Sequence, residues 1–112
     1  MYMTVDVAVD VAVEASAEVR KALAEPRRWR IVELLACEEL CVCHLAEEVG
    51  IPQPLVSHHL KVLRAAGLVE SEKHRQWTYY RLRSAALDDL GERISEITAC
   101  CPSPGERRRP CE

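Results

Sequence analysis

The fold of this chain is decided by residues 41–69, which read CVCHLAEEVGIPQPLVSHHLKVLRAAGLV. Two runs with helical apolar spacing are separated by Gly-Ile-Pro at residues 50–52, and Gly67 ends the second run, as glycine often does directly after a helix. A helix, a glycine-containing turn and a second helix make a helix-turn-helix. We therefore expect helices at about residues 41–49 and 53–66.

A β-hairpin is expected directly after this motif. Residues 68–71 and 77–82 are rich in β-prone side chains and flank the polar segment 72–76, which is the pattern of two strands joined by a turn. A hairpin in this position is a wing. The sequence therefore predicts a winged helix-turn-helix that is mainly α-helical with one small β-hairpin.

Further helices are expected before the motif. The apolar spacing from Glu14 onward is helical until Pro26, which ends that helix and suits the first turn of the next one. Residues 27–37, which include Trp29, are apolar nearly all round. We expect this segment to be the central buried helix.

A last helix is expected after the hairpin, from Ser84 as its N-cap to about Thr98. Apolar residues recur along it at spacings of three, four and three, at Leu87, Leu90, Ile94 and Ile97. Such a stripe on a terminal helix suits the seam between two copies of the chain. We therefore expect a homodimer.

The chain divides into three expected segments. Residues 1–13 form a flexible N-terminal arm, residues 14–99 form the DNA-binding and dimerisation domain, and residues 100–112 form a tail that contains Cys, Pro and Arg. The N-terminus lacks the basic flank and uninterrupted apolar run of a signal peptide, and no other apolar stretch is long enough to span a bilayer. The expectation is a cytoplasmic protein with no membrane partner.

Charge is distributed unevenly along the chain. The net charge is -3, yet residues 53–83 carry six basic and two acidic side chains, a local sum of +4. Contacts with nucleic-acid phosphates need such a local basic surface rather than a basic chain as a whole. The acidic total therefore does not exclude a DNA-binding protein.

The second helix of the motif carries a polar strip. At about 100° per residue, Gln53, Ser57, Lys61 and Arg64 lie on one arc of the helix, and His58 lies at the edge of that arc. Gln53 and Ser57 suit base edges, whereas Lys61 and Arg64 suit phosphates. Arg75 at the hairpin tip is placed to enter a minor groove or to touch a phosphate. A solvated surface is the alternative for each residue taken alone, but helix, wing and local charge together favour DNA binding.

Three segments carry a resemblance to a known family. They are LAEPRRWRI at residues 23–31, ELCVCHL at residues 39–45 and QPLVSHHLKVLRAAGLV at residues 53–69. Together they closely resemble the ArsR/SmtB family of metal-sensing repressors. The resemblance implies a dimeric winged helix-turn-helix that binds operator DNA without its inducer and dissociates when a metal ion or arsenite binds.

Six cysteines without an export signal indicate reduced thiols and metal or redox chemistry. Cys41 and Cys43 lie in a motif similar to the thiolate motif of the arsenic, antimony, cadmium and lead branches of that family. Because residues two apart point about 200° from each other on a regular helix, we expect both to face one ion only if the helix start unwinds. Ion capture there would distort that helix and move the recognition helix within the dimer.

Trivalent arsenic or antimony takes three sulfurs, since thiolates select soft ions, so a third ligand is needed. Cys37 is the preferred candidate because at most a short loop separates it from Cys41. Cys100 and Cys101 are alternatives, as a vicinal pair that could use Cys111 or fold back from the tail. The expected inducer is As(III) or Sb(III), with Cd(II) or Pb(II) as the alternative.

Other interpretations of these cysteines stay open. Oxidation in place of metal binding would make the protein a thiol-redox regulator, and Cys37 and Cys43 could instead be small core residues. An enzyme is not expected, because His58 faces the polar strip while His59 faces the core. We therefore expect no catalytic residue and no small-molecule substrate.

Overall fold

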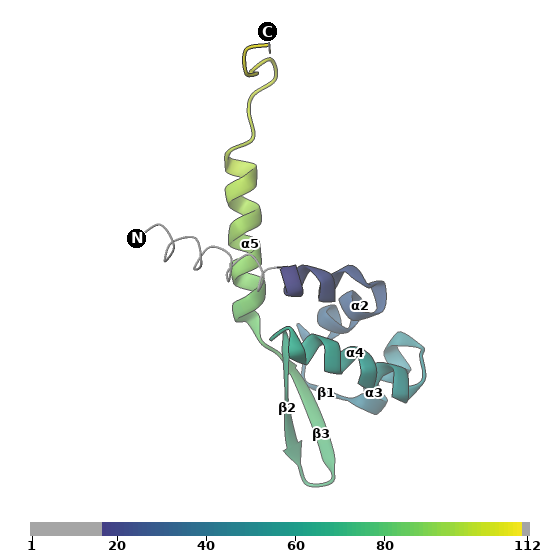
Figure 1. Cartoon of the computed structure of the whole chain (residues 1–112). Helices are drawn as coiled ribbons and strands as arrows, with labels where there is room; N and C mark the ends of the chain where they lie inside the picture. Colours follow the sequence, from purple (N-terminus) through teal and green to yellow (C-terminus); the bar gives the residue numbers. More distant parts are fainter. Residues whose placement is uncertain (1–16, 111–112) are drawn as a thin grey trace, which may run out of the picture.

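The computed structural model describes residues 17–110 of the 112-residue chain. Residues 17–24 are helical, and the elements that follow are α2 (Pro26–Leu35), β1 (Leu40–Cys41), α3 (Val42–Val49), α4 (Gln53–Ala65), β2 (Val69–His74), β3 (Trp77–Leu82) and α5 (Ser84–Ala99) (Figure 1). The arm expected at residues 1–13 and Cys111 lie outside the described residues. Within residues 17–110, no helix combines the length and the apolar character needed to cross a membrane.

α3 and α4 form the expected helix-turn-helix. Gly50 ends α3 with a φ of 77°, and its N–H donates to the carbonyl of Ala46 at 2.8 Å. Glycine fits this left-handed conformation because it has no Cβ to strain. After α4, Gly67 adopts a φ of 78°, and the N–H of Leu68 donates to the carbonyl of Leu63 at 2.9 Å. The helices thus end where the sequence places their breakers.

The sheet has three antiparallel strands in the order β1-β3-β2. β2 and β3 are the hairpin that the sequence predicts, six residues long on each side. β1 was not expected: Leu40 lies opposite Tyr80 and Cys41 opposite Tyr79. A strand of two residues is too short to show the alternation from which strands are recognised. Its pairing nevertheless ties the segment before α3 to the wing.

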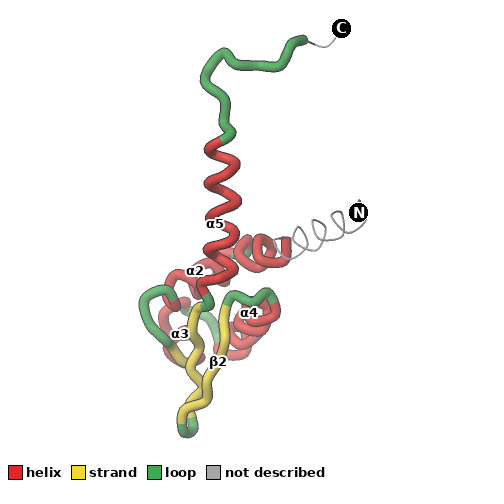
Figure 2. The backbone as a smooth tube through the Cα atoms, turned by 90° about the vertical axis from the view of Figure 1, so that its left-hand side faces the viewer, coloured by secondary structure: helices red, strands yellow, loops and turns green. Residues whose placement is uncertain are grey.

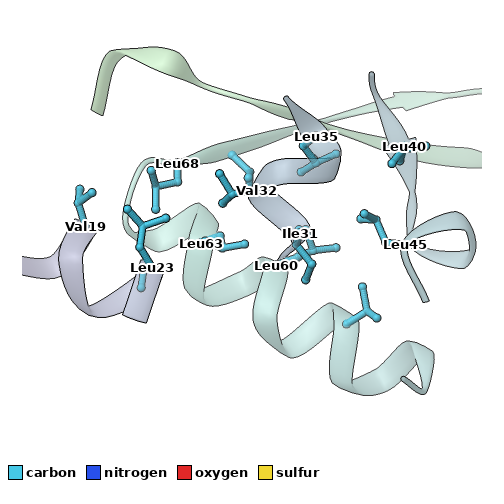
Figure 3. Packing of buried hydrophobic residues seen from close by; sticks show 13 residues of the cluster. Val19, Leu23, Ile31, Val32, Leu35, Leu40, Leu45, Leu60, Leu63 and Leu68 are labelled. Atoms are coloured by element: carbon cyan, nitrogen blue, oxygen red, sulfur yellow. The ribbon is translucent and has the colours of Figure 1, made fainter. Parts of the chain in front are cut away.

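One hydrophobic core joins the helices to the base of the sheet (Figure 3). Its largest fully buried side chains are Ile31, Leu45, Val56, Leu60, Leu63, Leu68 and Val69. Burial of a side chain of this size stabilises the fold by roughly 1.5–3 kcal/mol. Figure 3 shows Ile31 of α2 close to Leu60 of α4, with Leu45 of α3 on the other side. The core therefore fixes how α4 sits on the domain.

The expected burial of the whole second helix is wrong for Trp29, which is 50% exposed. The buried face of α2 is formed by Ile31, Val32 and Leu35. At about 100° per residue, Trp29 lies about 160° from Ile31 around the helix axis. The indole therefore faces solvent in this chain, and α2 ends at Leu35 rather than at residue 37.

Ser84 is not the N-cap of the last helix. The N–H of Arg83 donates to the carbonyl of Leu68 at 2.8 Å, which holds Arg83 in an extended conformation directly after β3. Arg83 is therefore the N-cap residue, and Ser84 is the first residue of α5.

α5 and the hairpin project in opposite directions from the helical body (Figures 1 and 2). Leu87 and Leu90 at the start of the α5 stripe are half-buried against the core. Farther along, Ile94 is 54% and Ile97 is 72% exposed. The second half of the apolar stripe thus faces solvent in the single chain.

His59 is a buried polar side chain on the inner face of α4, only 5% exposed. Its Nδ1 lies 3.5 Å from Nη1 of Arg28, and its Nε2 has no hydrogen-bond partner within the described residues. Burial lowers the pKa of His59, and the positive charges of Arg28 and Arg27 act in the same direction, against the opposing effect of Glu25. The side chain is therefore held neutral, in the structural role that the sequence assigns to it.

This burial predicts a pH-dependent stability. The unfolded chain takes up a proton at a histidine near pH 6.5, whereas folded His59 resists protonation, so the free energy of unfolding falls as the pH drops through that value. His59→Gln should flatten the dependence between pH 8 and pH 5.5 in urea unfolding. His58→Gln, at the exposed neighbour, is the matched control and should leave the slope unchanged. An equal slope for all three proteins would contradict the assignment.

Candidate nucleic-acid interface and metal centre

The outer face of α4 presents the polar strip that the sequence predicts. Its exposed residues are Gln53, Ser57, His58, Lys61 and Arg64. On the opposite side Val56, Leu60 and Leu63 are buried in the core. Because the inner face is packed, the exposed side chains project from a helix held in place on the domain. This is the arrangement of a recognition helix that lies in a major groove.

Arg75 lies at the tip of the hairpin, far along the chain from α4. It is exposed and adopts a φ of 59°, in the left-handed region that favours glycine. A non-glycine residue in this conformation carries backbone strain, and such strain is often found at functional positions. The two-residue turn at residues 75–76 therefore presents a charged side chain where a glycine would be the relaxed choice.

The basic residues of residues 53–83 fall into two groups. Arg81 forms ion pairs with Glu70, Glu72 and Glu39, with its Nη1 2.6 Å from Oε2 of Glu72, and Arg83 lies 3.8 Å from Glu70. The hydrogen bond from Arg81 lowers the pKa of Glu70 below its usual value. These two arginines are thus committed to carboxylates of the sheet and of the segment before β1.

The remaining cations of this segment make no ion pair within the described residues. They are Lys61 and Arg64 on α4 and Lys73 and Arg75 on the wing. All four are exposed. The charge available to phosphates is therefore carried by the outer face of α4 and the tip of the hairpin, and not by the hairpin base.

A second cluster lies where β1 passes into α3. Sγ of Cys41 is 2.9 Å from Sγ of Cys43 and 3.2 Å from Nδ1 of His44. The three ligand atoms all lie within 4.8 Å of one another. Cys41 is buried, Cys43 is half-buried and His44 is exposed. Soft and borderline metal ions take this combination of sulfur and nitrogen donors.

The expected unwinding of the helix start is not needed to bring the two sulfurs together. Cys41 is the N-cap of α3, with a φ of -88° and a ψ of 168°, and it pairs with Tyr79 as part of β1. Its side chain therefore follows the geometry of a strand rather than that of a helix. The separation of about 200° applies only between residues that are both helical.

The two thiols differ in acidity. Burial alone would raise the pKa of Cys41, but the hydrogen bond from the Cys43 thiol and the backbone amides of His44 and Cys43 outweigh it and lower that pKa. The same hydrogen bond, with burial and the charge of Cys41, raises the pKa of Cys43. Of the two thiols, Cys41 is therefore the one that more readily loses its proton.

The other expected ligands lie outside this cluster. Cys37 follows α2, is exposed, and lies with its Sγ 3.8 Å from the Glu33 carbonyl. It lines, together with His44, a groove of about 640 Å³. Cys100 and Cys101 are exposed at the end of α5, which points away from the helical body (Figure 2).

Comparison with known proteins assigns the family. The family model described as bacterial regulatory protein, arsR family, matches residues 25–71. An uncharacterised HTH-type transcriptional regulator of Methanocaldococcus jannaschii is 35% identical over 75% of this chain and 96% of its own length. The arsenical resistance operon repressor of Staphylococcus aureus is 39% identical over 69% of this chain and 74% of its own length. The chain belongs to the ArsR family.

Solved structures agree with this assignment. An ArsR-like transcriptional regulator from Rhodococcus sp. RHA1 matches with a TM-score of 0.71 at 30% identity, covering 79% of this chain and 83% of that one. The homodimeric winged helix-turn-helix DNA-binding domain of a possible ArsR-family regulator from Mycobacterium bovis matches with a TM-score of 0.65 at 31% identity, over 80% of this chain and 81% of its own. The predicted winged helix-turn-helix is confirmed, and the chain is an ArsR-family transcriptional repressor rather than an enzyme.

His44 is the residue of this ArsR-family chain that sequence analysis missed. The signal was present, because a histidine directly follows Cys43 and stands three positions after Cys41. The requirement of a trivalent metalloid for a third sulfur does not select an imidazole. Side chains three apart meet on one face of a helix, and the extended Cys41 still comes within 3.2 Å of the imidazole.

Proposed function

We propose that this ArsR-family repressor binds operator DNA as a homodimer and releases it when As(III) or Sb(III) binds at Cys41 and Cys43. The observation that carries the proposal is the 2.9 Å approach of these two sulfurs at the start of the helix-turn-helix. The similar repressor of Staphylococcus aureus belongs to an arsenical resistance operon, which supports this class of inducer.

Trivalent metalloids need a third sulfur, and Cys37 is our candidate. It is exposed and lines the same groove as His44, whose Nδ1 belongs to the cluster. Cys100 and Cys101 remain the alternatives because a second subunit could bring them near. The buried Cys41 and the half-buried Cys43 supply the other two sulfurs.

In this proposal the signal reaches the DNA-binding surfaces by two routes. Cys43 lies in α3, which packs against α4, so a shift of Cys43 moves the recognition helix. Cys41 lies in β1, which pairs with β3 of the wing, and Glu39 beside it forms an ion pair with Arg81 at 3.8 Å. When both sulfurs bind one ion, the conformation at the junction of β1 and α3 changes. The recognition helix α4 and the wing therefore shift together.

The proposed DNA contacts follow from exposure and charge. α4 enters the major groove, where Gln53 and Ser57 reach base edges and Lys61 and Arg64 contact phosphates, with His58 beside them. Arg75 at the wing tip contacts the adjacent minor groove or its phosphates. Lys61, Arg64 and Arg75 form no ion pair with any carboxylate among residues 17–110, which supports this assignment because their charges need no release from those carboxylates before they bind.

The proposed homodimer uses α5. Ile94 and Ile97 continue the stripe of Leu87 and Leu90 but are exposed in the single chain. Covering them with a second copy removes apolar surface from water and presents two recognition helices to a pseudo-palindromic operator. The domain at residues 14–99 then contains both functions, the tail at residues 100–112 lies beyond the seam, and the repressor acts in the cytoplasm.

A thiol-redox regulator of the same fold is the second candidate. Two sulfurs 2.9 Å apart, one of them with a lowered pKa, are arranged for oxidation. Loss of operator binding after peroxide treatment, reversed by dithiothreitol without added metalloid, would favour this candidate. Release by arsenite under reducing conditions favours the metalloid proposal.

The DNA-binding model predicts how affinity responds to salt. Lys61→Ala/Arg75→Ala should weaken binding to all sequences and lower the slope of log affinity against log salt by about 2, since each lost phosphate contact removes about 1. Gln53→Ala and Ser57→Ala should instead reduce the preference for the operator over scrambled DNA. Fluorescence anisotropy across a salt series measures both effects. Lys21→Ala, an exposed cation on the first helix, is the control, and wild-type affinity in the double variant would refute the model.

The dimer model predicts a monomer when the α5 stripe is charged. Ile94→Asp would bury an unpaired carboxylate at the seam, which costs several kcal/mol if it stays ionised. Sedimentation equilibrium should then show a monomer, and operator binding should fall with it. Ser95→Asp adds the same charge beside the stripe and should stay dimeric. A dimeric Ile94→Asp protein would place the seam elsewhere.

The metalloid model predicts that substitutions at the cysteines remove the response to arsenite without removing operator binding. Cys41→Ser and Cys43→Ser keep the side-chain size but lose the soft ligand, so each should bind the operator and require at least about tenfold more arsenite for release. Cys37→Ser should share this phenotype, while a chain ended after Ala99 should respond normally. If the shortened chain loses the response and Cys37→Ser keeps it, the third sulfur lies in the tail.

A further inference from the structure

We propose that the indole of Trp77 is a further DNA contact of this repressor, packed against deoxyribose at the edge of the minor groove that Arg75 enters. This inference rests on the proposed function, because it assumes that the wing meets DNA. It adds an apolar contact to a surface of cations and hydrogen-bonding groups. The two kinds of contact respond differently to salt, which makes the inference testable.

Trp77 is the first residue of β3 and stands at the outer end of the hairpin. It pairs with His74 across the turn. Among the described residues, the outermost strand pairing between the wing and β1 joins Tyr79 to Cys41, so Trp77 lies two residues, about 7 Å, farther out. The hairpin projects from the helical body in both views (Figures 1 and 2). The indole therefore belongs to the tip, together with Arg75.

The fold leaves much of this large apolar side chain in water, since Trp77 is 48% exposed. Residues alternate between the two faces of a strand. The face of β3 that carries Tyr80 and Leu82 packs against the core, whereas Trp77 lies on the other face. Single exposed apolar residues are common on protein surfaces, but aromatic rings contribute much of the binding energy of interfaces because they cover a large area. A partner that covers the tip would therefore bury apolar surface that the single chain exposes.

The charges around the indole indicate which partner this is. The segment from Lys73 to Trp77 contains two cations, Lys73 and Arg75, and no carboxylate. Neither cation forms an ion pair within residues 17–110. Glu72, the next residue along β2, is held in an ion pair by Arg81. The tip thus presents an aromatic ring beside two cations, and proteins that bind the minor groove combine basic and apolar side chains in this way.

Salt separates this contact from the ionic ones. An apolar contact releases no counterions, so Trp77→Val should weaken binding by at least about fivefold and leave the slope of log affinity against log salt unchanged. Valine keeps a high preference for strands, which protects the hairpin. Arg75→Ala should instead lower that slope by about 1. Fluorescence anisotropy measures both effects, with a labelled duplex that the wild-type protein selects from a random pool.

Trp29→Leu is the matched control. Trp29 is 50% exposed, but it lies about 160° around α2 from Ile31, and Ile31 faces Leu60 of α4 (Figure 3). Trp29 therefore points away from the recognition helix, and Trp29→Leu should bind the duplex as the wild type does. This variant also leaves Trp77 as the single tryptophan of the chain. Its emission should be quenched, and become less accessible to acrylamide, when the unlabelled duplex is added, whereas the emission of Trp29 in Trp77→Val should not change.

Wild-type affinity in Trp77→Val would overturn the inference, and the proposed function would stand if Lys61→Ala/Arg75→Ala still lost affinity. Weaker binding by Trp77→Val, without any change of Trp77 emission in Trp29→Leu, would also overturn it, because the indole would then only support the hairpin. Wild-type affinity in both Trp77→Val and Lys61→Ala/Arg75→Ala would refute the proposed DNA-binding surface itself.

Discussion

The antiparallel pairing of Cys41 with Tyr79 is the constraint on which both functional surfaces of this repressor depend. It holds Cys41 in an extended conformation as the last residue of β1 and the N-cap of α3. Because of this conformation, the sulfurs of Cys41 and Cys43 meet at 2.9 Å without any loss of helix. The same pairing ties Cys41 to β3 of the wing, so the proposed ion site and the proposed DNA-binding surface share one piece of backbone.

The basic residues differ in whether they form ion pairs with carboxylates. A chain with a net charge of -3 binds DNA only if its cations are separated from its carboxylates. Arg81 satisfies three glutamates at the hairpin base, including Glu39 beside the ligand cluster. Lys61 and Arg75 are exposed and form no ion pair with the part of the chain that the structure describes. The groove that His44 lines carries five glutamates instead, so one small domain presents surfaces of opposite charge.

Most of the fold follows from local sequence signals. Glycine and proline breakers and the 3.6-residue apolar period predict α3 and α4, and β-prone runs around a polar segment predict the hairpin, because these elements each depend on residues close together in the chain. The parts that sequence reasoning missed depend on distant residues. β1 exists only because β3 pairs with it, the N-cap of α5 moves to Arg83 because Leu68 accepts its N–H, and Trp29 is exposed because the core needs only one face of α2. Only part of the candidate site was predicted. Cys41 and Cys43 form a local sequence motif, whereas the contact of His44 with Cys41 depends on the extended backbone of Cys41 in β1.

The proposed switch requires that the inducer bind the free repressor more tightly than the DNA-bound one. An inducer shifts the repressor off DNA only by the difference between its affinities for the free and the DNA-bound forms, commonly 1–3 kcal/mol in allosteric proteins. By reciprocity, operator DNA must weaken ion binding by the same factor. The shared backbone supplies a physical source for that difference. In the proposed complex, DNA would hold α4 and the wing in one relative position, and the junction of β1 and α3 between them would be less free to adjust to an ion. Because Cys41 is buried and strand-paired while Cys43 is half-buried and His44 exposed, the proposed adjustment falls on α3, the helix that also packs against the recognition helix.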